Sequence, residues 1–157
     1  MKILMVCLGN ICRSPMAEGI LRKKAQEKKL DIKVDSAGFE SYHSGEQPDP
    51  RAILTTKKHG VDITNIRSRV FRYEDFNDFD KIYVMDKWNY EDVMSVAKTN
   101  EDRAKVDFFL NLITPDKNES VGDPYYGKVD GFEEVFQLLD IGCDIICTEF
   151  IRNKKNT

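Results

Sequence analysis

The chain has 157 residues, of which 41% are hydrophobic and 32% are charged, and its net charge at pH 7 is −3. This composition is typical of one globular domain with its own core and excludes a disordered chain. The slightly acidic balance gives no general attraction to nucleic acid or to an anionic membrane, and the apolar runs are too short to span a bilayer. Residues 1–7 lack the features of a signal peptide. We therefore expect a cytoplasmic protein in which residues 1–157 form a single domain.

The first predicted elements surround a distinctive segment. Residues 2–7 predict a buried strand, and residues 7–14 read Cys-Leu-Gly-Asn-Ile-Cys-Arg-Ser. A helix is expected next, with Ser14 as its N-cap and Pro15 as its first residue, where the missing N–H is tolerated. An apolar stripe at helical spacing supports this helix: Ala17, Ile20, Leu21 and Ala25.

The rest of the chain continues the alternation of strands and helices. A second strand is predicted at 32–36, followed by a loop rich in Gly, Ser and Pro. Further elements are expected at 51–59 (a helix ending at Gly60), 81–85 (a strand), 104–109 (a weaker strand) and 132–150 (a long amphipathic helix). This order favours a parallel sheet in an α/β sandwich, which binds ligands at the carboxyl ends of its strands. Cys7 would lie at that edge.

Cys7 and Arg13 have the spacing of a thiol nucleophile and its anion-binding partner. A thiol attacks as its thiolate, which positive potential stabilises, and a loop entering a helix N-terminus supplies backbone N–H groups and the helix dipole. Arg13 adds a fork of donors that fits two phosphate oxygens. Gly9 lets the backbone approach a phosphate, and Asn10 tolerates a left-handed conformation. The segment therefore predicts a cradle in which Cys7 attacks a phosphoryl group.

The cysteine and histidine inventory bears on redox state and metals. The four cysteines, at 7, 12, 143 and 147, could form two disulfides, but free thiols are expected in a reducing compartment. With two histidines in the chain, a zinc site lacks ligands at workable spacing. Cys143 and Cys147 lie on the apolar stripe of the last helix and are expected in the core. We expect no metal.

Two separated motifs resemble one enzyme family. Residues 7–14 resemble the phosphate-binding loop of the low-molecular-weight protein tyrosine phosphatases, and Asp123-Pro124-Tyr125-Tyr126-Gly127 resembles that family's second signature. Similar stretches at 35–37 and 84–86 extend the resemblance from Lys2 to about Phe150. It implies a single-domain three-layer sandwich with a four-stranded parallel sheet. It also implies hydrolysis of phosphotyrosine through a cysteinyl-phosphate intermediate, without a cofactor.

The resemblance also implies residue roles. Asp123 would protonate the leaving tyrosinate oxygen and then activate water, Ser14 would donate a hydrogen bond to the thiolate, and Ser36 would support Asn10. Cys12 would trap oxidised Cys7 as a disulfide. Asn65 stands where eukaryotic members place a histidine of the supporting network. The remaining binding residues would be Leu8, Gly9, Ile11 and Cys12 of the loop, and Tyr42, Tyr125 and Tyr126, which with Leu8 and Ile11 would wall a deep slot for phosphotyrosine.

Several alternatives remain at this point. Cys7 could be a core cysteine, Asp123-Pro124 an ordinary turn, and the tyrosines surface aromatics. Arsenate reductases of this fold need further cysteines near residues 75–90, where this chain has none, and protein arginine phosphatases carry threonine where this chain has Ile11. A non-catalytic phosphate-binding module and a thiol redox protein rank lower. We expect phosphotyrosine-containing proteins as partners, phosphate as product and competitive ligand, and a monomer or weak homodimer.

Overall fold

The structure, a computed structural model, describes the backbone of residues 1–127 and 129–157 and the side chains of residues 1–127 and 131–157. Its centre is a sheet of four parallel strands in the order β2-β1-β3-β4. The strands are β1 (Lys2–Val6), β2 (Lys33–Ala37), β3 (Lys81–Val84) and β4 (Val106–Phe108). The predicted fold class, an α/β sandwich around a four-stranded parallel sheet, is confirmed.

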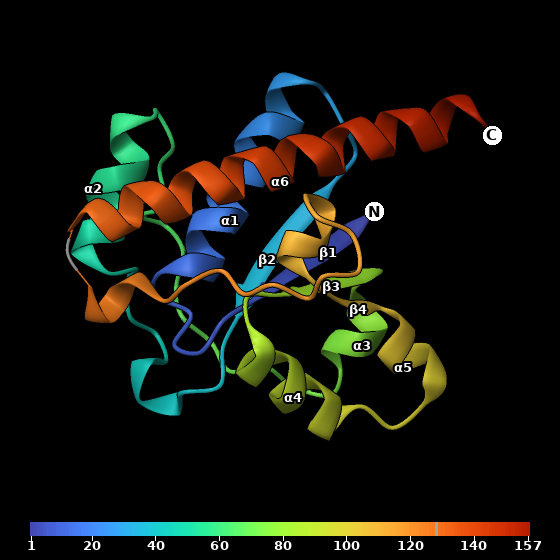
Figure 1. Cartoon of the computed structure of the whole chain (residues 1–157), viewed down its shortest axis with the longest axis horizontal. Coiled ribbons are helices and arrows are strands. Elements are labelled where there is room, and N and C mark those ends of the chain that lie inside the picture. The colour runs from blue at the N-terminus through green and yellow to red at the C-terminus, as the bar shows by residue number, and fades with distance from the viewer. Residues whose placement is uncertain (128) are drawn as a thin grey trace.

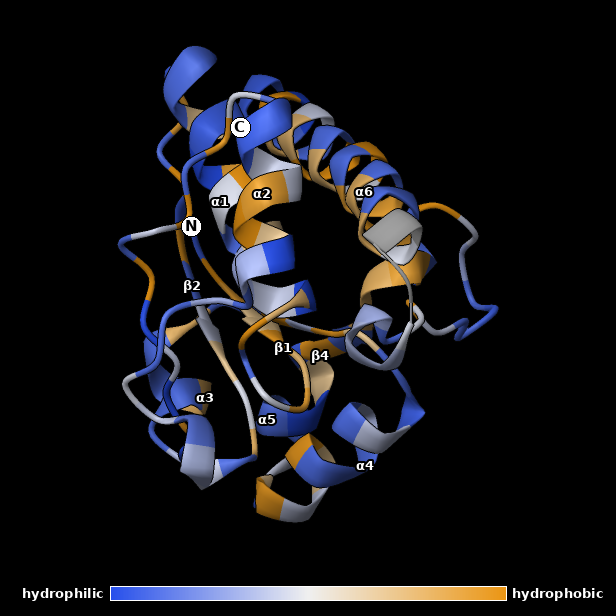
Figure 2. Cartoon of the chain, turned by 90° about the vertical axis from the view of Figure 1, so that its left-hand side faces the viewer, coloured by the Kyte–Doolittle hydropathy of each residue, from blue (hydrophilic) through white to orange (hydrophobic). Residues whose placement is uncertain are grey.

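The helices cover both faces of this sheet (Figures 1 and 2). One layer contains α1 (Arg13–Glu27), α2 (Pro50–Lys58) and the long α6 (Val129–Lys155). The opposite layer contains α3 (Asp75–Asp78), α4 (Lys87–Val96) and α5 (Asn100–Ala104). Three 3-10 turns complete the described elements: η1 (Ser41–His43), η2 (Phe109–Leu112) and η3 (Pro124–Tyr126).

The strand β1 is apolar on both sides because both of its faces are covered. Ile3 and Met5 point into the core beneath α1 and α6, whereas Leu4 and Val6 point into the core beneath α3 and α4. A central parallel strand therefore appears as a continuous apolar run rather than an alternating one. This buried strand gives Cys7, the next residue, a fixed position at the sheet edge.

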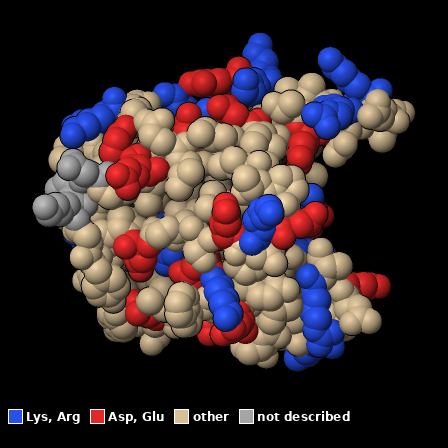
Figure 3. All heavy atoms as spheres, in the orientation of Figure 1, with Lys and Arg blue, Asp and Glu red and all other residues tan. Residues whose placement is uncertain are grey.

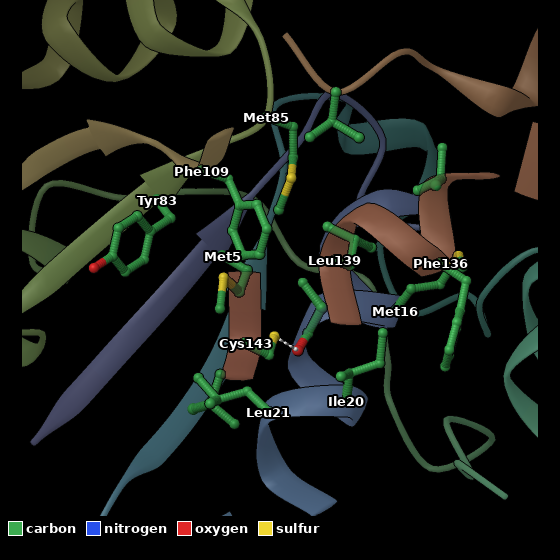
Figure 4. Packing of buried hydrophobic residues seen from close by; sticks show 14 of the residues in the cluster. Met5, Met16, Ile20, Leu21, Tyr83, Met85, Phe109, Phe136, Leu139 and Cys143 are labelled. Carbon is green, nitrogen blue, oxygen red and sulfur yellow. Dashed lines mark hydrogen bonds between the residues drawn. The ribbon is translucent and has the colours of Figure 1, made fainter. Parts of the chain in front are cut away.

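The larger core is formed where α6 crosses α1. Figure 4 shows Phe136, Leu139 and Cys143 of α6 facing Met16 and Ile20 of α1. The Cys143 thiol donates to the Ala17 carbonyl at 3.7 Å, and burial raises the pKa of that thiol well above its usual value. Cys147 is buried in the same core. The expectation that these two cysteines pack in the core is confirmed.

The predicted strands are all present, with ends shifted by one or two residues, and α2 ends at the expected place because Gly60 follows it with φ +74°. The short helices α3 and α5 carry too few residues to show a helical apolar period, so the sequence did not predict them. The predicted helix start at Ser14 is wrong: α1 begins at Arg13, and Cys12 occupies the N-cap position. Pro15 is thus the third helical residue, where an N–H would still lack an intrahelical acceptor.

Charged side chains of both signs are interspersed over the face shown in Figure 3. None of the helices in the described part of the chain combines the length and the apolar character that crossing a bilayer requires.

Candidate active site

The loop between β1 and α1 lies at the carboxyl edge of the sheet, as expected. Cys7 is 2% exposed, and Asn10 adopts the left-handed conformation with φ +54°. Among the described residues, no hydrogen bond uses the backbone N–H groups of residues 8–13. These donors, at the N-terminus of α1, remain available to an anion.

The hydrogen bonds of Asn10 determine that the Ser14 hydroxyl donates its proton toward Cys7. The backbone N–H of Arg69 donates to Asn10 Oδ1 at 3.0 Å, so the other end of the amide is the donor, Nδ2. Nδ2 donates to Ser14 Oγ at 2.8 Å and to Ser36 Oγ at 2.9 Å. Ser14 Oγ therefore has its own proton free for Cys7 Sγ, which lies 3.0 Å away. This explains why Ser14 does not cap α1: its hydroxyl is committed to the loop.

A buried carboxylate ends the same network. Ser36 donates to Glu18 Oε1 at 2.6 Å, and Arg22 pairs with the other oxygen of Glu18. Burial raises the pKa of the Glu18 carboxyl, opposed by the hydrogen bond from Ser36 and the charge of Arg22. Asn65, at the position of the histidine in eukaryotic members, is exposed and makes none of these hydrogen bonds. Glu18 on α1 accepts the Ser36 proton.

Arg13 is buried, and its guanidinium is oriented by two hydrogen bonds that it donates through Nη1. Its Nη1 donates to Asp86 Oδ2 at 2.6 Å and to the Val121 carbonyl at 2.9 Å. Burial alone would lower the pKa of the guanidinium, but the negative charges of Cys7, Asp123 and Asp86 outweigh burial and raise it. Among the described residues, Nε has no hydrogen-bond partner and Nη2 has only the long 3.5 Å contact with Asp123, and Arg13 lines the pocket. The edge formed by Nε and Nη2 suits two oxygens of a phosphate.

Asp123 faces Arg13 from the segment before α6. Its Oδ2 lies 3.5 Å from Arg13 Nη2, and its Oδ1 accepts the backbone N–H of Tyr125 at 3.0 Å. The second contact makes Asp123 the N-cap of η3. The turn interpretation and the catalytic interpretation of Asp123-Pro124 are therefore compatible, since the capping oxygen differs from the one that faces the site.

Aromatic side chains surround the mouth of the pocket. Tyr42 and Tyr126 are mostly exposed, Tyr125 is 41% exposed, and the Tyr125 and Tyr126 rings pack edge to face. The carboxylate of Glu40 raises the pKa of Tyr42 to about 12 by accepting its hydrogen bond. Together these side chains line a pocket with Cys7 and Arg13 at its base. The full lining is Cys7, Leu8, Gly9, Ile11, Cys12, Arg13, Glu40, Tyr42, His43, Asp123, Tyr125 and Tyr126.

Comparison with known proteins decides which group of enzymes has this arrangement. The family described as low molecular weight phosphotyrosine protein phosphatase matches residues 2–156. The chain belongs to this family. A putative low molecular weight protein-tyrosine-phosphatase of Synechocystis is 41% identical over 150 residues, covering 94% of this chain and 95% of that protein.

Solved structures agree with this family assignment. A protein tyrosine phosphatase of Entamoeba histolytica, with Hepes in its active site, superimposes with a TM-score of 0.89 at 37% identity and covers 98% of this chain and 99% of that one. A Drosophila arginine phosphatase superimposes with a TM-score of 0.88 at 34% identity and covers 96% of this chain and 98% of that one. Proteins named for two phosphoryl substrates thus share the fold of this low molecular weight phosphatase.

Several residues that shape the site carry no distinctive sequence signal. Asp86 orients Arg13, and in the sequence it stands out only as the last residue of the stretch 84–86 that resembles the family. A Cβ on Gly38 would lie 2.7 Å from the Leu8 carbonyl oxygen and 2.8 Å from the Asn10 nitrogen, so only glycine lets the chain after β2 approach the loop this closely. Asp49 and Arg51 lie beside the loop at the start of α2. The charge partners of Arg13 lie far from it in the sequence, so the spacing of residues within the motif does not reveal them.

Cys12 is buried in the loop between β1 and α1, and no disulfide joins it to Cys7 in the structure. Burial and the negative charge of Cys7 raise the pKa of the Cys12 thiol far above its usual value. At neutral pH Cys12 is therefore a thiol rather than a thiolate. In the described part of the chain, no three acidic, cysteine or histidine side chains form a group that could hold a metal ion.

Proposed function

We propose that this low molecular weight phosphatase hydrolyses phosphotyrosine in proteins, with Cys7 as nucleophile. The observation that carries the proposal is the ordered set of donors around Cys7 Sγ: the Ser14 hydroxyl at 3.0 Å, the free amides of residues 8–13, and the open Nε edge of Arg13. A thiolate and a phosphate dianion would both be stabilised by these donors.

The reaction proceeds in two displacements at phosphorus. The Cys7 thiolate forms a bond to phosphorus as the bond to the tyrosine oxygen breaks, and Asp123 gives its proton to that oxygen. Water then attacks the cysteinyl phosphate, Asp123 takes a proton from the water, and Cys7 leaves as the thiolate. Arg13 and the loop amides hold the phosphoryl oxygens through both steps. General acid catalysis is needed because tyrosinate, with a pKa near 10, leaves slowly without a proton.

The pocket wall supports an aryl phosphate as substrate. Tyr42, Tyr125 and Tyr126 offer ring faces, while Leu8 and Ile11 add apolar surface nearer the loop. A slot of this kind lets a phosphate on a long flat ring reach Cys7 at its base, whereas phosphoserine is too short. Gly9, Asn10 and Cys12 complete the phosphate-binding loop, and Ser36 supports it.

Phosphoarginine is the second candidate substrate, because the similar Drosophila structure, at 34% identity, is named an arginine phosphatase. Ile11 argues against it, since an apolar side chain leaves guanidinium donors unpaired at a cost of roughly 1–3 kcal/mol each. We further propose that the enzyme works without a cofactor, in the reducing cytoplasm where its four free cysteines stay reduced, as a monomer or weak homodimer. Inorganic phosphate, the product, should compete with substrate.

The decisive experiment compares hydrolysis of matched phosphotyrosine and phosphoarginine peptides by the purified protein. We expect faster turnover of phosphotyrosine, a shift toward phosphoarginine in Ile11→Thr, and no turnover in Cys7→Ser, which should still bind vanadate. Preference of the wild type for phosphoarginine would overturn the substrate assignment. Turnover by Cys7→Ser would overturn the mechanism.

The role of Asp123 needs a separate test. Asp123→Asn keeps the size of the side chain but removes the transferable proton. Single-turnover release of a series of phenols should slow by about 10²–10⁴-fold for basic leaving groups and much less for acidic ones. An unchanged dependence on leaving-group pKa would assign the acid to another residue.

A further inference from the structure

A second network, separate from the one behind Cys7, connects the phosphate-binding loop to the start of α2. The backbone N–H of Asp49 donates to the Ile11 carbonyl at 2.8 Å. The Asp49 carboxylate caps α2 by accepting the Arg51 backbone N–H at 2.8 Å. The same carboxylate accepts Arg51 Nε at 3.0 Å and Nη2 at 2.9 Å. The Asp49 carboxylate thus forms a bidentate ion pair with Arg51, and Asp49 is itself hydrogen-bonded to the loop.

The other side of the Arg51 guanidinium binds the segment that carries Asp123. Nη2 donates to the Tyr125 carbonyl at 3.0 Å and Nη1 to the Gly127 carbonyl at 3.4 Å. The guanidinium also lies over the rings of Tyr125, at 5.5 Å, and Phe132, at 4.7 Å. Figure 1 shows the start of α2 beside the segment that precedes α6. One side chain therefore joins two segments that are distant in the sequence.

The connection reaches Asp123 through Tyr125. Tyr125 accepts from Arg51 with its carbonyl and donates its N–H to Asp123 Oδ1 at 3.0 Å. Arg51 thus fixes the residue that orients the Asp123 carboxylate. A continuous path runs from the Ile11 carbonyl through Asp49, Arg51 and Tyr125 to Asp123.

We propose that Arg51 is a positioning residue that holds Asp123 at the correct distance from a phosphoryl group bound in the loop. The inference rests on the proposed function, because it takes Asp123 as the general acid. Arg51 does not line the pocket and touches no reacting atom. Its planar fork suits the task, since it binds a carboxylate on one edge, carbonyls on the other and aromatic rings on its faces. A lysine ammonium cannot make these contacts together.

The test measures phenol release in a single turnover for Arg51→Gln and Arg51→Lys. A catalytic group displaced by about 1 Å can lose about 10²-fold in rate, so we expect a loss of about 10–100-fold for basic phenols in Arg51→Gln and a smaller loss in Arg51→Lys. Acidic phenols should be affected little, and vanadate affinity should change less than about threefold. Arg103→Gln, at an exposed arginine bonded to Asn100 on α5, is the matched control and should behave like wild type.

A double-mutant cycle with Asp123→Asn separates positioning from a general structural effect. If Arg51 acts through Asp123, adding Arg51→Gln to Asp123→Asn should cause no further loss of phenol release. Additive losses would overturn the inference and leave the proposed function intact. If Asp123→Asn alone leaves the leaving-group dependence unchanged, the acid assignment fails instead. Should Arg51→Gln not fold, Arg51→Lys enters the same cycle with the same two outcomes.

Discussion

Asp86 is the residue whose removal most directly tests how Arg13 is held. The Arg13 side chain is 2% exposed and that of Asp86 is 13% exposed, so their 2.6 Å contact is an ion pair that is mostly shielded from solvent. Asp86 has a second task, because its other oxygen accepts the Asn89 N–H at 2.9 Å and caps α4. Asparagine offers only one oxygen, so Asp86→Asn removes the charge and one of the two contacts.

The expected loss of stability follows from what Arg13 retains. Removing one partner of a buried ion pair typically costs about 3–5 kcal/mol, because the remaining charge is uncompensated. Arg13 keeps the Val121 carbonyl at 2.9 Å and the longer 3.5 Å contact with Asp123. We therefore expect the lower end, about 3 kcal/mol, for Asp86→Asn. Asp86→Ala also loses the cap, which adds about 1 kcal/mol.

Urea unfolding measures these free energies, with the transition midpoint compared at constant slope. For a chain of this length, 3 kcal/mol corresponds to a fall in Tm of about 6–12 °C. Glu91→Gln, at an exposed acidic residue on the same helix, is the control and should stay within about 0.5 kcal/mol of wild type. A midpoint for Asp86→Asn equal to that of Glu91→Gln would show that Asp86 does not compensate Arg13, and would refute the charge argument.

Three further predictions follow from other contacts. Mild peroxide should oxidise Cys7 to the sulfenic acid, which condenses with the Cys12 thiol to a disulfide and releases water. Dithiothreitol should then restore activity. Peptide mapping that finds no Cys7–Cys12 disulfide would contradict this prediction. Gly38→Ala should cost about 1–3 kcal/mol in urea unfolding, since its Cβ meets backbone atoms at 2.7 and 2.8 Å, whereas Gly122→Ala, with nothing within 4 Å, should be near neutral; equal stabilities would contradict the steric argument. Burial opposes ionisation of Asp49, but the hydrogen bonds and charge of Arg51 outweigh it and lower the pKa of that carboxyl. The resulting stability is present above the unfolded pKa of about 3.9 and is lost as pH falls through the lower folded pKa, so stability below pH about 4 should fall less steeply in Arg51→Gln than in wild type.

The sequence predicts those parts of the fold that have a clear apolar run, a clear apolar periodicity or a residue that terminates a helix. The apolar run of β1, the stripe of α6 and the glycine after α2 each arise from one local physical cause, and each is present. The short β4 was placed within two residues, although its three residues show little alternation. The sequence predicts the start of α1 one residue too late because Ser14 is a good N-cap by type, and only the tertiary structure shows its hydroxyl bonded to Asn10 and Cys7.

The site was predictable to the extent that its chemistry lies in contiguous motifs. The loop of residues 7–14 and the segment at Asp123 do lie together, and the three tyrosines line the same pocket. The supporting residues were not predictable, because Glu18, Asp49 and Arg51 are ordinary charged residues in the sequence. Asn65 occupies the position of the family histidine in the sequence, yet it is exposed, and Glu18 on α1 ends the network.

The supporting residues determine in which direction the hydrogen-bond donors of the loop point, and the motif alone leaves these directions undefined. Within the loop, Ser14 could donate to Asn10 or to Cys7; the N–H of Arg69, 59 residues from Asn10, turns the amide and so directs the Ser14 proton to Cys7. Arg13 could likewise present either edge of its guanidinium. Asp86 and Val121, 73 and 108 residues away, occupy Nη1 and leave Nε without a partner among the described residues, so we propose that this side of the guanidinium binds phosphate. Because these dipoles are aligned before substrate arrives, the transition state need not reorganise them, and this preorganisation is the main source of electrostatic catalysis. The catalytic loop therefore depends for its orientation on distant parts of the chain.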